Sequence, residues 1–113
     1  MDCIFCKIVN GDIPTDKVYE NDFVLAFRDL SPQAPEHLLI IPKKHIATLN
    51  DFSADDAQIF GEMGQAAKAV AKELGVDENG YRVVINCNQD GGQTVFHTHM
   101  HFLAGRSLSW PPG

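Results

Sequence analysis

The segment Val95-Phe96-His97-Thr98-His99-Met100-His101-Phe102-Leu103 decides how the rest of the chain is interpreted. Three of the five histidines of the chain lie in it, at a spacing of two residues and alternating with Phe96, Thr98, Met100 and Phe102. Successive side chains of an extended strand point to opposite faces, so the segment predicts a strand with His97, His99 and His101 on one face. A histidine-rich tract would be exposed and irregular, and we therefore favour three imidazoles that line a site.

The spacing of these histidines separates a metal site from a catalytic site. A strand rises about 3.3 Å per residue, so the backbones of His97 and His101 lie roughly 13 Å apart. A metal ion binds imidazole nitrogens at about 2.0–2.1 Å, and at most two of the three histidines are expected to share one ion. Neutral imidazole can act as a nucleophile, an acid or a base near pH 7, and we expect the row to do such work.

A glycine-containing loop, Asp90-Gly91-Gly92-Gln93-Thr94, directly precedes the histidine row. Two glycines allow backbone N–H groups to approach an anion closely. The same residues also form ordinary turns between strands, so the loop alone is weak support. Its position before the histidines favours a phosphate cradle.

Composition limits the class of protein. With 113 residues, the chain fits one domain, residues 1–113. Its net charge of −6 argues against a nucleic-acid polymer as ligand, because phosphodiester backbones are bound by basic patches. A small phosphorylated ligand stays compatible. The sequence has neither an apolar run long enough to span a bilayer nor a basic N-terminus followed by an apolar stretch, so we expect no membrane association and a cytoplasmic location.

The N-terminus carries Cys3-Ile4-Phe5-Cys6, and a Cys-x-x-Cys motif is half of a zinc site or a redox pair. A redox pair usually begins a helix of a longer βαβ chain, which this sequence does not indicate. Zinc needs two more ligands, for which His45 and His97 are the best candidates. Two buried free thiols are the alternative, and the residues alone leave both open.

Periodicity predicts strands over residues 17–20, 23–28, 37–42, 81–87 and 95–103, and one long helix over residues 53–74. Ser53 and Asp56 form a capping box at the start of the helix, and Gly75 follows its end. Hairpins and a single helix indicate an α+β fold with an antiparallel sheet and the helix on one face. So small a sheet leaves edges, which a symmetric dimer would cover.

Two residues near predicted strand ends keep two interpretations each. Asp29 ends a strand and faces either a ligand or solvent. His37 begins a strand and is either a hydrogen-bonded structural group or part of the site.

Taken together, five segments resemble the histidine triad family, in its branch of histidine-triad nucleotide-binding proteins. They are 97–103, 31–37 (Ser-Pro-Gln-Ala-Pro-Glu-His), 41–45 (Ile-Pro-Lys-Lys-His), the glycine loop, and the terminal Trp110-Pro111-Pro112-Gly113. The resemblance implies a single histidine-triad domain with a five-stranded antiparallel sheet, one long helix and a short N-terminal helix. It also implies a homodimer whose two sheets join into ten strands.

The resemblance further implies hydrolysis of purine nucleoside 5′-phosphoramidates to a nucleoside monophosphate and an amine, through a nucleotidyl-histidine. By similarity, His99 would attack phosphorus, His101 would hold a phosphate oxygen, and the His97 carbonyl would accept the other ring N–H of His99. His37 would lie beside His97 in a polar network, and Thr94 would contact the leaving group.

By similarity, the nucleotide would contact residues from every part of the chain. Those around the base and ribose are Ile4, Phe5, Ile8, Phe27, Asp29 and Leu30; those beside the phosphate are Asn86, Gly92, Gln93, Thr94, Val95, His99 and His101; Trp110 would come from the partner subunit. The implied partners are AMP, GMP or a phosphoramidate. No cofactor is needed for the chemistry, but a structural zinc would bind Cys3, Cys6, His45 and His97, and His97 could not then also relay protons with His37.

Two other classes compete with the phosphoramidate hydrolase. One is a nucleotide-binding interaction or regulatory protein in which hydrolysis is incidental. The other is a small module stabilised by zinc, which would unfold on chelation.

Overall fold

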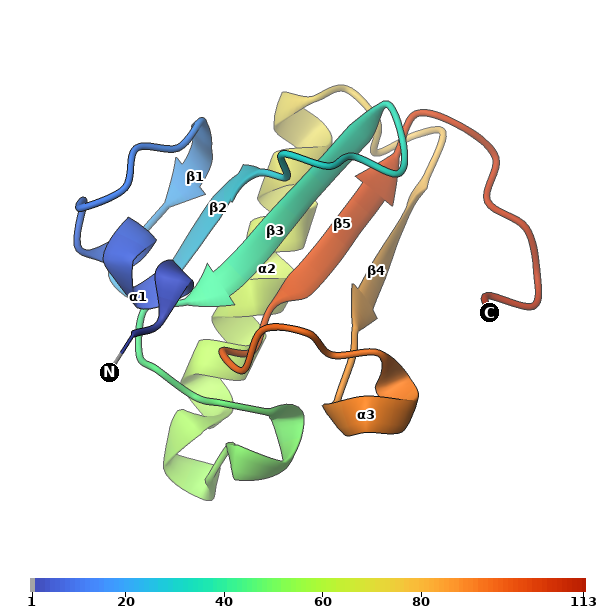
Figure 1. Ribbon diagram of the computed structural model, residues 1–113. Helices are drawn as coiled ribbons and strands as arrows, with labels where there is room; N and C mark the ends of the chain where they lie inside the picture. The colour runs from blue at the N-terminus through green and yellow to red at the C-terminus, as the bar shows by residue number, and fades with distance from the viewer. Residues whose placement is uncertain (1) are drawn as a thin grey trace.

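A computed structural model describes residues 2–113 and shows one antiparallel sheet with a helix on each face (Figure 1). The strands are β1 (Lys17–Glu20), β2 (Val24–Arg28), β3 (Glu36–Pro42), β4 (Tyr81–Ile85) and β5 (Met100–Ala104), in the order β1-β2-β3-β5-β4. The helices are α1 (Ile4–Val9), α2 (Ala57–Glu73) and the short α3 (Asn88–Gly91), with 3₁₀ turns at Leu49–Asp51 and Ala54–Asp56. The predicted α+β fold, with five strands, one long helix and a short N-terminal helix, is confirmed.

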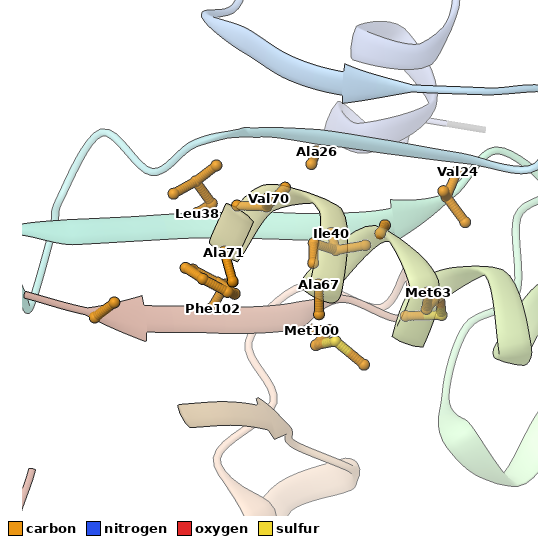
Figure 2. Packing of buried hydrophobic residues seen from close by; sticks show 12 residues of the cluster. Val24, Ala26, Leu38, Ile40, Met63, Ala67, Val70, Ala71, Met100 and Phe102 are labelled. Atoms are coloured by element: carbon orange, nitrogen blue, oxygen red, sulfur yellow. The ribbon is translucent and has the colours of Figure 1, made fainter. Parts of the chain in front are cut away.

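The long helix α2 covers one face of the sheet. Its buried side chains, among them Met63 and Val70, pack on alternate residues of β2, β3 and β5, such as Leu38, Ile40 and Phe102 (Figure 2). Each buried aliphatic side chain of this kind contributes about 1.5–3 kcal/mol to folding. The predicted capping box of Ser53 and Asp56 is present, although it closes a 3₁₀ turn ahead of the α-helix.

The short helix α1 covers part of the opposite face. Cys3 caps it, with the backbone N–H of Cys6 donating to the Cys3 sulfur. Phe5 and Ile8 are buried against Phe27 and Leu39 of the sheet. Because α1 is only six residues long, the end of this face toward β5 and β4 is left for other side chains.

The strand predicted over 95–103 is wrong in its first half, since β5 begins at Met100. Before it, the chain bends at residues 95–97, and the backbone N–H and hydroxyl of Thr98 both donate to the Ile46 carbonyl. The glycine loop also differs from a simple turn: residues 88–91 form α3, and Gly92 ends it with a φ of 83°, which favours glycine.

None of the helices within residues 2–113 is both long and apolar enough to cross a bilayer.

Candidate active site

The three histidines of the row lie on the face of the sheet that carries α1. The ring of Phe5 is edge-on to His97 and His99, at centroid distances of 5.8 and 5.2 Å, and the His99 and His101 rings are 5.1 Å apart. The three imidazoles therefore lie on one face, as predicted, although β5 begins only at Met100. Side chains that alternate with it, Met100 and Phe102, are buried under α2.

His99 has the geometry of a nucleophile. Its Nδ1 lies 2.8 Å from the main-chain oxygen of His97, and a carbonyl oxygen can only accept, so Nδ1 carries the proton. Nε2 of the neutral ring is then left with a lone pair. The contact that the family resemblance implied between His99 and the His97 carbonyl is present.

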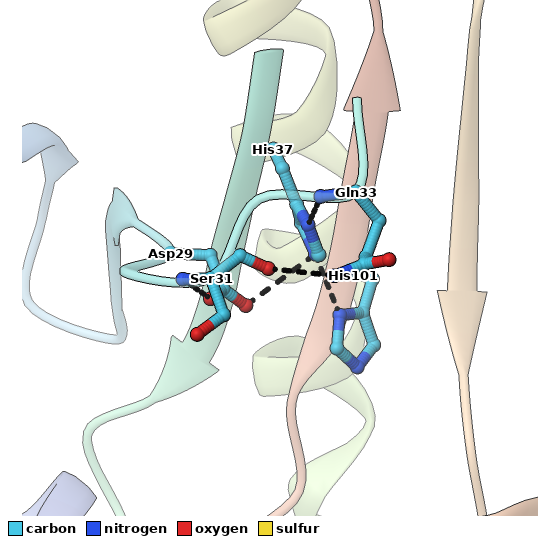
Figure 3. A network of polar contacts seen from close by, with 5 residues as sticks. All are labelled: Asp29, Ser31, Gln33, His37 and His101. Carbon is cyan, nitrogen blue, oxygen red and sulfur yellow. Dashed lines mark hydrogen bonds and ion pairs between the residues drawn. The ribbon is translucent and has the colours of Figure 1, made fainter. Parts of the chain in front are cut away.

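His37 lies beside His101 and not, as predicted, beside His97. Its Nε2 is 2.9 Å from His101 Nδ1 and 3.4 Å from a carboxylate oxygen of Asp29 (Figure 3). The register explains the correction, because β3 places His37 opposite Leu103 and Leu39 opposite His101. His97 meets the other end of β3, where its Nε2 is 2.8 Å from the Pro42 carbonyl.

The contacts of His37 fix the protons of this pair. The backbone N–H of Gln33 donates to His37 Nδ1 at 3.0 Å, so the single proton of the neutral ring lies on Nε2 and is donated to His101 Nδ1. His101 consequently carries its own proton on Nε2. Asp29, His37 and His101 have ligand atoms within 4.8 Å of one another. A metal ion would need the Nε2 lone pair of His37, but that nitrogen carries the proton donated to His101. These three side chains therefore form a hydrogen-bonded network and not a metal site.

Burial keeps these imidazoles neutral. It lowers the pKa of His37, against a smaller opposing effect of the Asp29 carboxylate. Burial also lowers the pKa of His101, with help from His99 and His37 and against Asp29. Near pH 7 both rings are therefore neutral, and His101 can donate from Nε2 to an anionic ligand.

A second cluster joins the N-terminus to the histidine row. Nδ1 of the fully buried His97 lies 3.4 Å from the Cys3 sulfur, 3.6 Å from the Cys6 sulfur and 3.2 Å from His45 Nδ1, and the Cys6 sulfur is 3.3 Å from His45 Nδ1. Because His97 donates from Nε2 to the Pro42 carbonyl, its Nδ1 has a lone pair. Burial lowers the pKa of His97, which favours the neutral ligand form.

These four residues fit a zinc ion. A tetrahedral centre with bonds of about 2.3 Å to sulfur and about 2.0–2.1 Å to nitrogen holds its ligand atoms roughly 3.3 to 3.8 Å apart. The contacts of 3.2–3.6 Å between the sulfur and nitrogen atoms agree with that spacing. The histidine's other nitrogen is hydrogen-bonded to a backbone carbonyl, as is usual for zinc-binding histidines.

An apolar cleft of about 390 Å³ opens between α1 and the end of β2. All six residues expected around the base and ribose line it: Ile4, Phe5, Ile8, Phe27, Asp29 and Leu30. The sequence reasoning missed the others, which are Ile13, Pro14, Thr15, Asp16, Arg28 and Leu39. Leu39 could have been found, because it alternates with His37 along β3.

The glycine loop lies near the histidines, but its residues have different tasks. The buried Gln93 side chain is committed to the backbone, accepting from Asn88 N–H and donating to the carbonyls of Ala47 and Val95. Thr94 and Val95 line a second cleft of about 450 Å³ together with Asp2, Cys3, Ile4, His45 and Phe96. The half-buried Asn86 directly follows β4, and the exposed Gly92 caps α3.

Trp110 lies apart from the histidines of its own chain. It is 80% exposed, and its ring is 5.9 Å from the guanidinium of Arg82 on β4, whose Nη2 donates to the Ser109 carbonyl. The tail thus runs along the outer side of β4 (Figure 1).

The chain is similar to known proteins over almost its whole length. The family model described as HIT domain matches residues 10–108, a range that excludes the Cys-x-x-Cys motif. The chain is 52% identical to the purine nucleoside phosphoramidase of Escherichia coli K12 over 105 residues, 93% of this chain and 88% of that one. It is also 53% identical to an uncharacterized HIT-like protein of Synechococcus elongatus over 112 residues, 99% of this chain and 97% of that one.

Solved structures show the same fold. A HIT family hydrolase of Legionella pneumophila superposes with a TM-score of 0.96 at 54% identity, covering 99% of this chain and all of that one. A histidine triad protein of Clostridium difficile superposes with a TM-score of 0.93 at 52% identity, covering 96% of this chain and 95% of that one.

Proposed function

The chain belongs to the HIT domain family and is a hydrolase; from this premise we propose that it cleaves the P–N bond of purine nucleoside 5′-phosphoramidates, releasing a nucleoside monophosphate and an amine. The observation that carries the proposal is the hydrogen bond of 2.8 Å from His99 Nδ1 to the His97 carbonyl. It leaves the Nε2 lone pair of the buried His99 ring available for attack, beside His101, whose Nε2–H can donate a hydrogen bond.

In the first step, His99 Nε2 attacks the α-phosphorus, the P–N bond breaks, and the leaving amine takes up a proton from solvent water. The ring of His99 becomes cationic as the bond forms, and the His97 carbonyl stabilises that charge through Nδ1–H. In the second step, water attacks phosphorus and gives one proton back to the solvent, the bond from phosphorus to His99 Nε2 breaks, and the nucleoside monophosphate leaves. The overall reaction consumes one water molecule.

His101 and Thr94 assist at the two sides of phosphorus. His101 Nε2–H donates to a non-bridging phosphate oxygen, and His37 keeps it in that tautomer. The Thr94 hydroxyl contacts the leaving amine. Asn86, Gly92 and Val95 complete the phosphate side, and Gln93 holds the loop in shape through its bonds to the backbone.

The nucleoside occupies the apolar cleft. Phe5 and Phe27 meet edge to face at 5.8 Å in its wall, and the wide ring of a purine buries more apolar surface there than a pyrimidine does. Asp29 at the rim of the cleft accepts from the ribose hydroxyls. The Asp29 carboxylate lies 3.4 Å from His37 Nε2, which supports a position of the sugar next to the pair of His37 and His101.

The zinc that Cys3, Cys6, His45 and His97 fit would act as a cross-link between α1 and the histidine row. It would stabilise the fold when bound and would not contact the substrate. The ring of His97 therefore has no role in proton transfer.

A homodimer completes the proposal. β4 is an edge of the sheet and exposes Tyr81 and Val83, so pairing of two copies along it would extend the sheet to ten strands and bring each Trp110 toward the partner's site. Sedimentation equilibrium tests this: Val83→Arg should convert a dimer to a monomer. A wild-type monomer at micromolar concentration would contradict it.

The function is tested by incubating the protein with adenosine and guanosine 5′-phosphoramidates of several amines and measuring the nucleoside monophosphate and the amine released. We expect equal amounts of both products and no turnover by His99→Ala. Tight binding of AMP without turnover of any phosphoramidate would favour a nucleotide-binding interaction protein instead. A protein that neither binds nor cleaves, but unfolds on chelation, would be a zinc-stabilised module.

A further inference from the structure

His97 faces two different centres with two different groups. Its ring points Nδ1 at Cys3, Cys6 and His45, and its main-chain carbonyl accepts the ring N–H of His99. His97 thus belongs to the cluster of Cys3, Cys6, His45 and His97 and also contacts His99 directly. Whatever fixes the ring of His97 also affects the direction of its carbonyl.

The peptide of His97 has little support from the sheet. β5 pairs with β3 and β4 only from Met100 to Ala104. Upstream of it, the segment is held by Thr98, whose N–H and hydroxyl donate to the Ile46 carbonyl at 2.7 and 2.8 Å, and by the bond from His97 Nε2 to Pro42. The ring of His97 is consequently one of its main anchors.

Without a metal, the Nδ1 side of that anchor depends on a single accepted hydrogen bond. The lone pair of His97 Nδ1 can accept from an Nδ1–H of His45 at 3.2 Å or, more weakly, from the thiol of Cys3 or Cys6 at 3.4 and 3.6 Å. A bound metal ion would replace these contacts by four ligand bonds and tie the ring to α1.

We infer that a metal ion in the Cys3/Cys6/His45/His97 cluster holds the His97 carbonyl in the direction that keeps the Nδ1–H tautomer of His99, so that metal occupancy sets the rate of nucleotidyl transfer. His97 is then a positioning residue, and the metal acts through it without touching the substrate. The inference rests on the proposed role of His99 as nucleophile. It also makes a distinction: the metal governs the chemical step, whereas the apolar cleft governs nucleotide binding.

The test is a zinc titration of metal-free wild type and of Cys6→Ser, which keeps three of the four ligands. Three quantities are measured: the ring ¹⁵N shifts of His99, the single-turnover rate of AMP release from an adenosine phosphoramidate, and the Kd of AMP. In zinc-saturated wild type, His99 should show one protonated nitrogen, Nδ1. Metal-free protein should show averaged tautomers and a rate about 10- to 100-fold lower, the usual effect of losing an outer-shell partner, with the Kd changed less than about threefold.

In Cys6→Ser, the tautomer and the rate should follow zinc with one shared midpoint, shifted to higher concentration. Cys87→Ser removes the cysteine outside the cluster and should leave all three quantities unchanged. Folded metal-free protein that keeps the Nδ1–H tautomer and the full rate would overturn the inference. So would unfolding of both metal-free proteins, because the metal would then act on folding alone.

The ring shifts separate this inference from the proposed function. If zinc-saturated wild type cleaves no phosphoramidate, the proposed function fails. If it cleaves them and the His99 tautomer does not respond to zinc, only the inference fails.

Discussion

In four of the five histidines, the neighbouring groups determine which ring nitrogen keeps the proton. The Pro42 carbonyl accepts a hydrogen bond from His97 Nε2–H, so that Nδ1 keeps its lone pair. The Gln33 N–H donates to His37 Nδ1, so that Nε2–H is available to His101. The His97 carbonyl leaves His99 Nε2 free to attack. In the proposed mechanism, neighbouring groups thus make one imidazole a metal ligand, another a hydrogen-bond donor and a third a nucleophile.

The first prediction concerns His37. In His37→Ala, His101 loses the partner at Nδ1 that keeps its proton on Nε2, and kcat should fall about 10- to 100-fold, by analogy with the loss of partners that orient a functional histidine. The Kd of AMP should stay nearly unchanged. Gln33→Ala is the matched control, because it keeps the backbone N–H that contacts His37. Equal kcat values for the two variants would show that His101 does not depend on His37.

The second prediction concerns Asp29. If its carboxylate accepts from the ribose hydroxyls, Asp29→Asn should weaken kcat/KM about 10- to 100-fold, as expected for hydrogen bonds to a charged group. Asparagine keeps an oxygen for the Ser31 N–H that Asp29 now caps at 2.7 Å. With a 2′,3′-dideoxynucleoside phosphoramidate, wild type and variant should be nearly equal. A similar loss on both substrates would place the effect of Asp29 on His37 and not on the ribose.

At the scale of elements, the sequence pattern located most strands and helices but not the bend before β5. β1 is found as predicted, and β2 and β3 differ by one residue at one end. The alternation of His97, His99 and His101 could not reveal that residues 95–97 bend, because the cause lies in distant partners. Those partners, Ile46 and Pro42, hold Thr98 and His97 away from the sheet ladder.

The third prediction concerns the corner where β5 ends. Gly105 has a φ of 96°, and a Cβ there would lie 2.8 Å from the Cβ of Pro35, in the loop that leads to His37. Gly105→Ala should therefore destabilise the protein by about 2–4 kcal/mol in urea unfolding, from the left-handed backbone and the clash together. Gly64→Ala, on the exposed side of α2, is the control and should stabilise by about 1 kcal/mol or less. A similar stability of both variants would mean that the loop adjusts freely.

At the scale of the molecule, the sheet separates stability from chemistry. The face under α2 is a continuous apolar core, and the opposite face holds the apolar cleft, the histidine row and the cluster of Cys3, Cys6, His45 and His97. Single-strand alternation predicted which histidines share a face, and family resemblance supplied the cleft residues. Neither could pair His37 with His101, because that contact depends on the register between β3 and β5, which are 58 residues or more apart in the chain (residues 42 and 100).

The fourth prediction is the pH dependence of stability. Burial lowers the pKa of His37 and His101, so below their ordinary value of about 6.5 the unfolded chain binds more protons than the folded one. The free energy of unfolding should therefore be constant in this respect above about pH 6.5 and fall as the pH drops toward the folded pKa values. Thermal unfolding of wild type and His37→Gln at equal zinc, between pH 7 and pH 5, isolates the effect. A drop of equal size in both proteins would contradict it.

The central claim is covalent nucleotidyl transfer through His99. The most direct measurement is intact-protein mass spectrometry of wild type and His99→Ala, quenched rapidly without acid during turnover of an adenosine phosphoramidate. We predict one adenylyl group on wild type and none on the variant, with AMP accumulating only with wild type. AMP formed at the wild-type rate by His99→Ala, or formed by wild type without any adduct in a quench shown to preserve a phosphohistidine standard, would contradict the account.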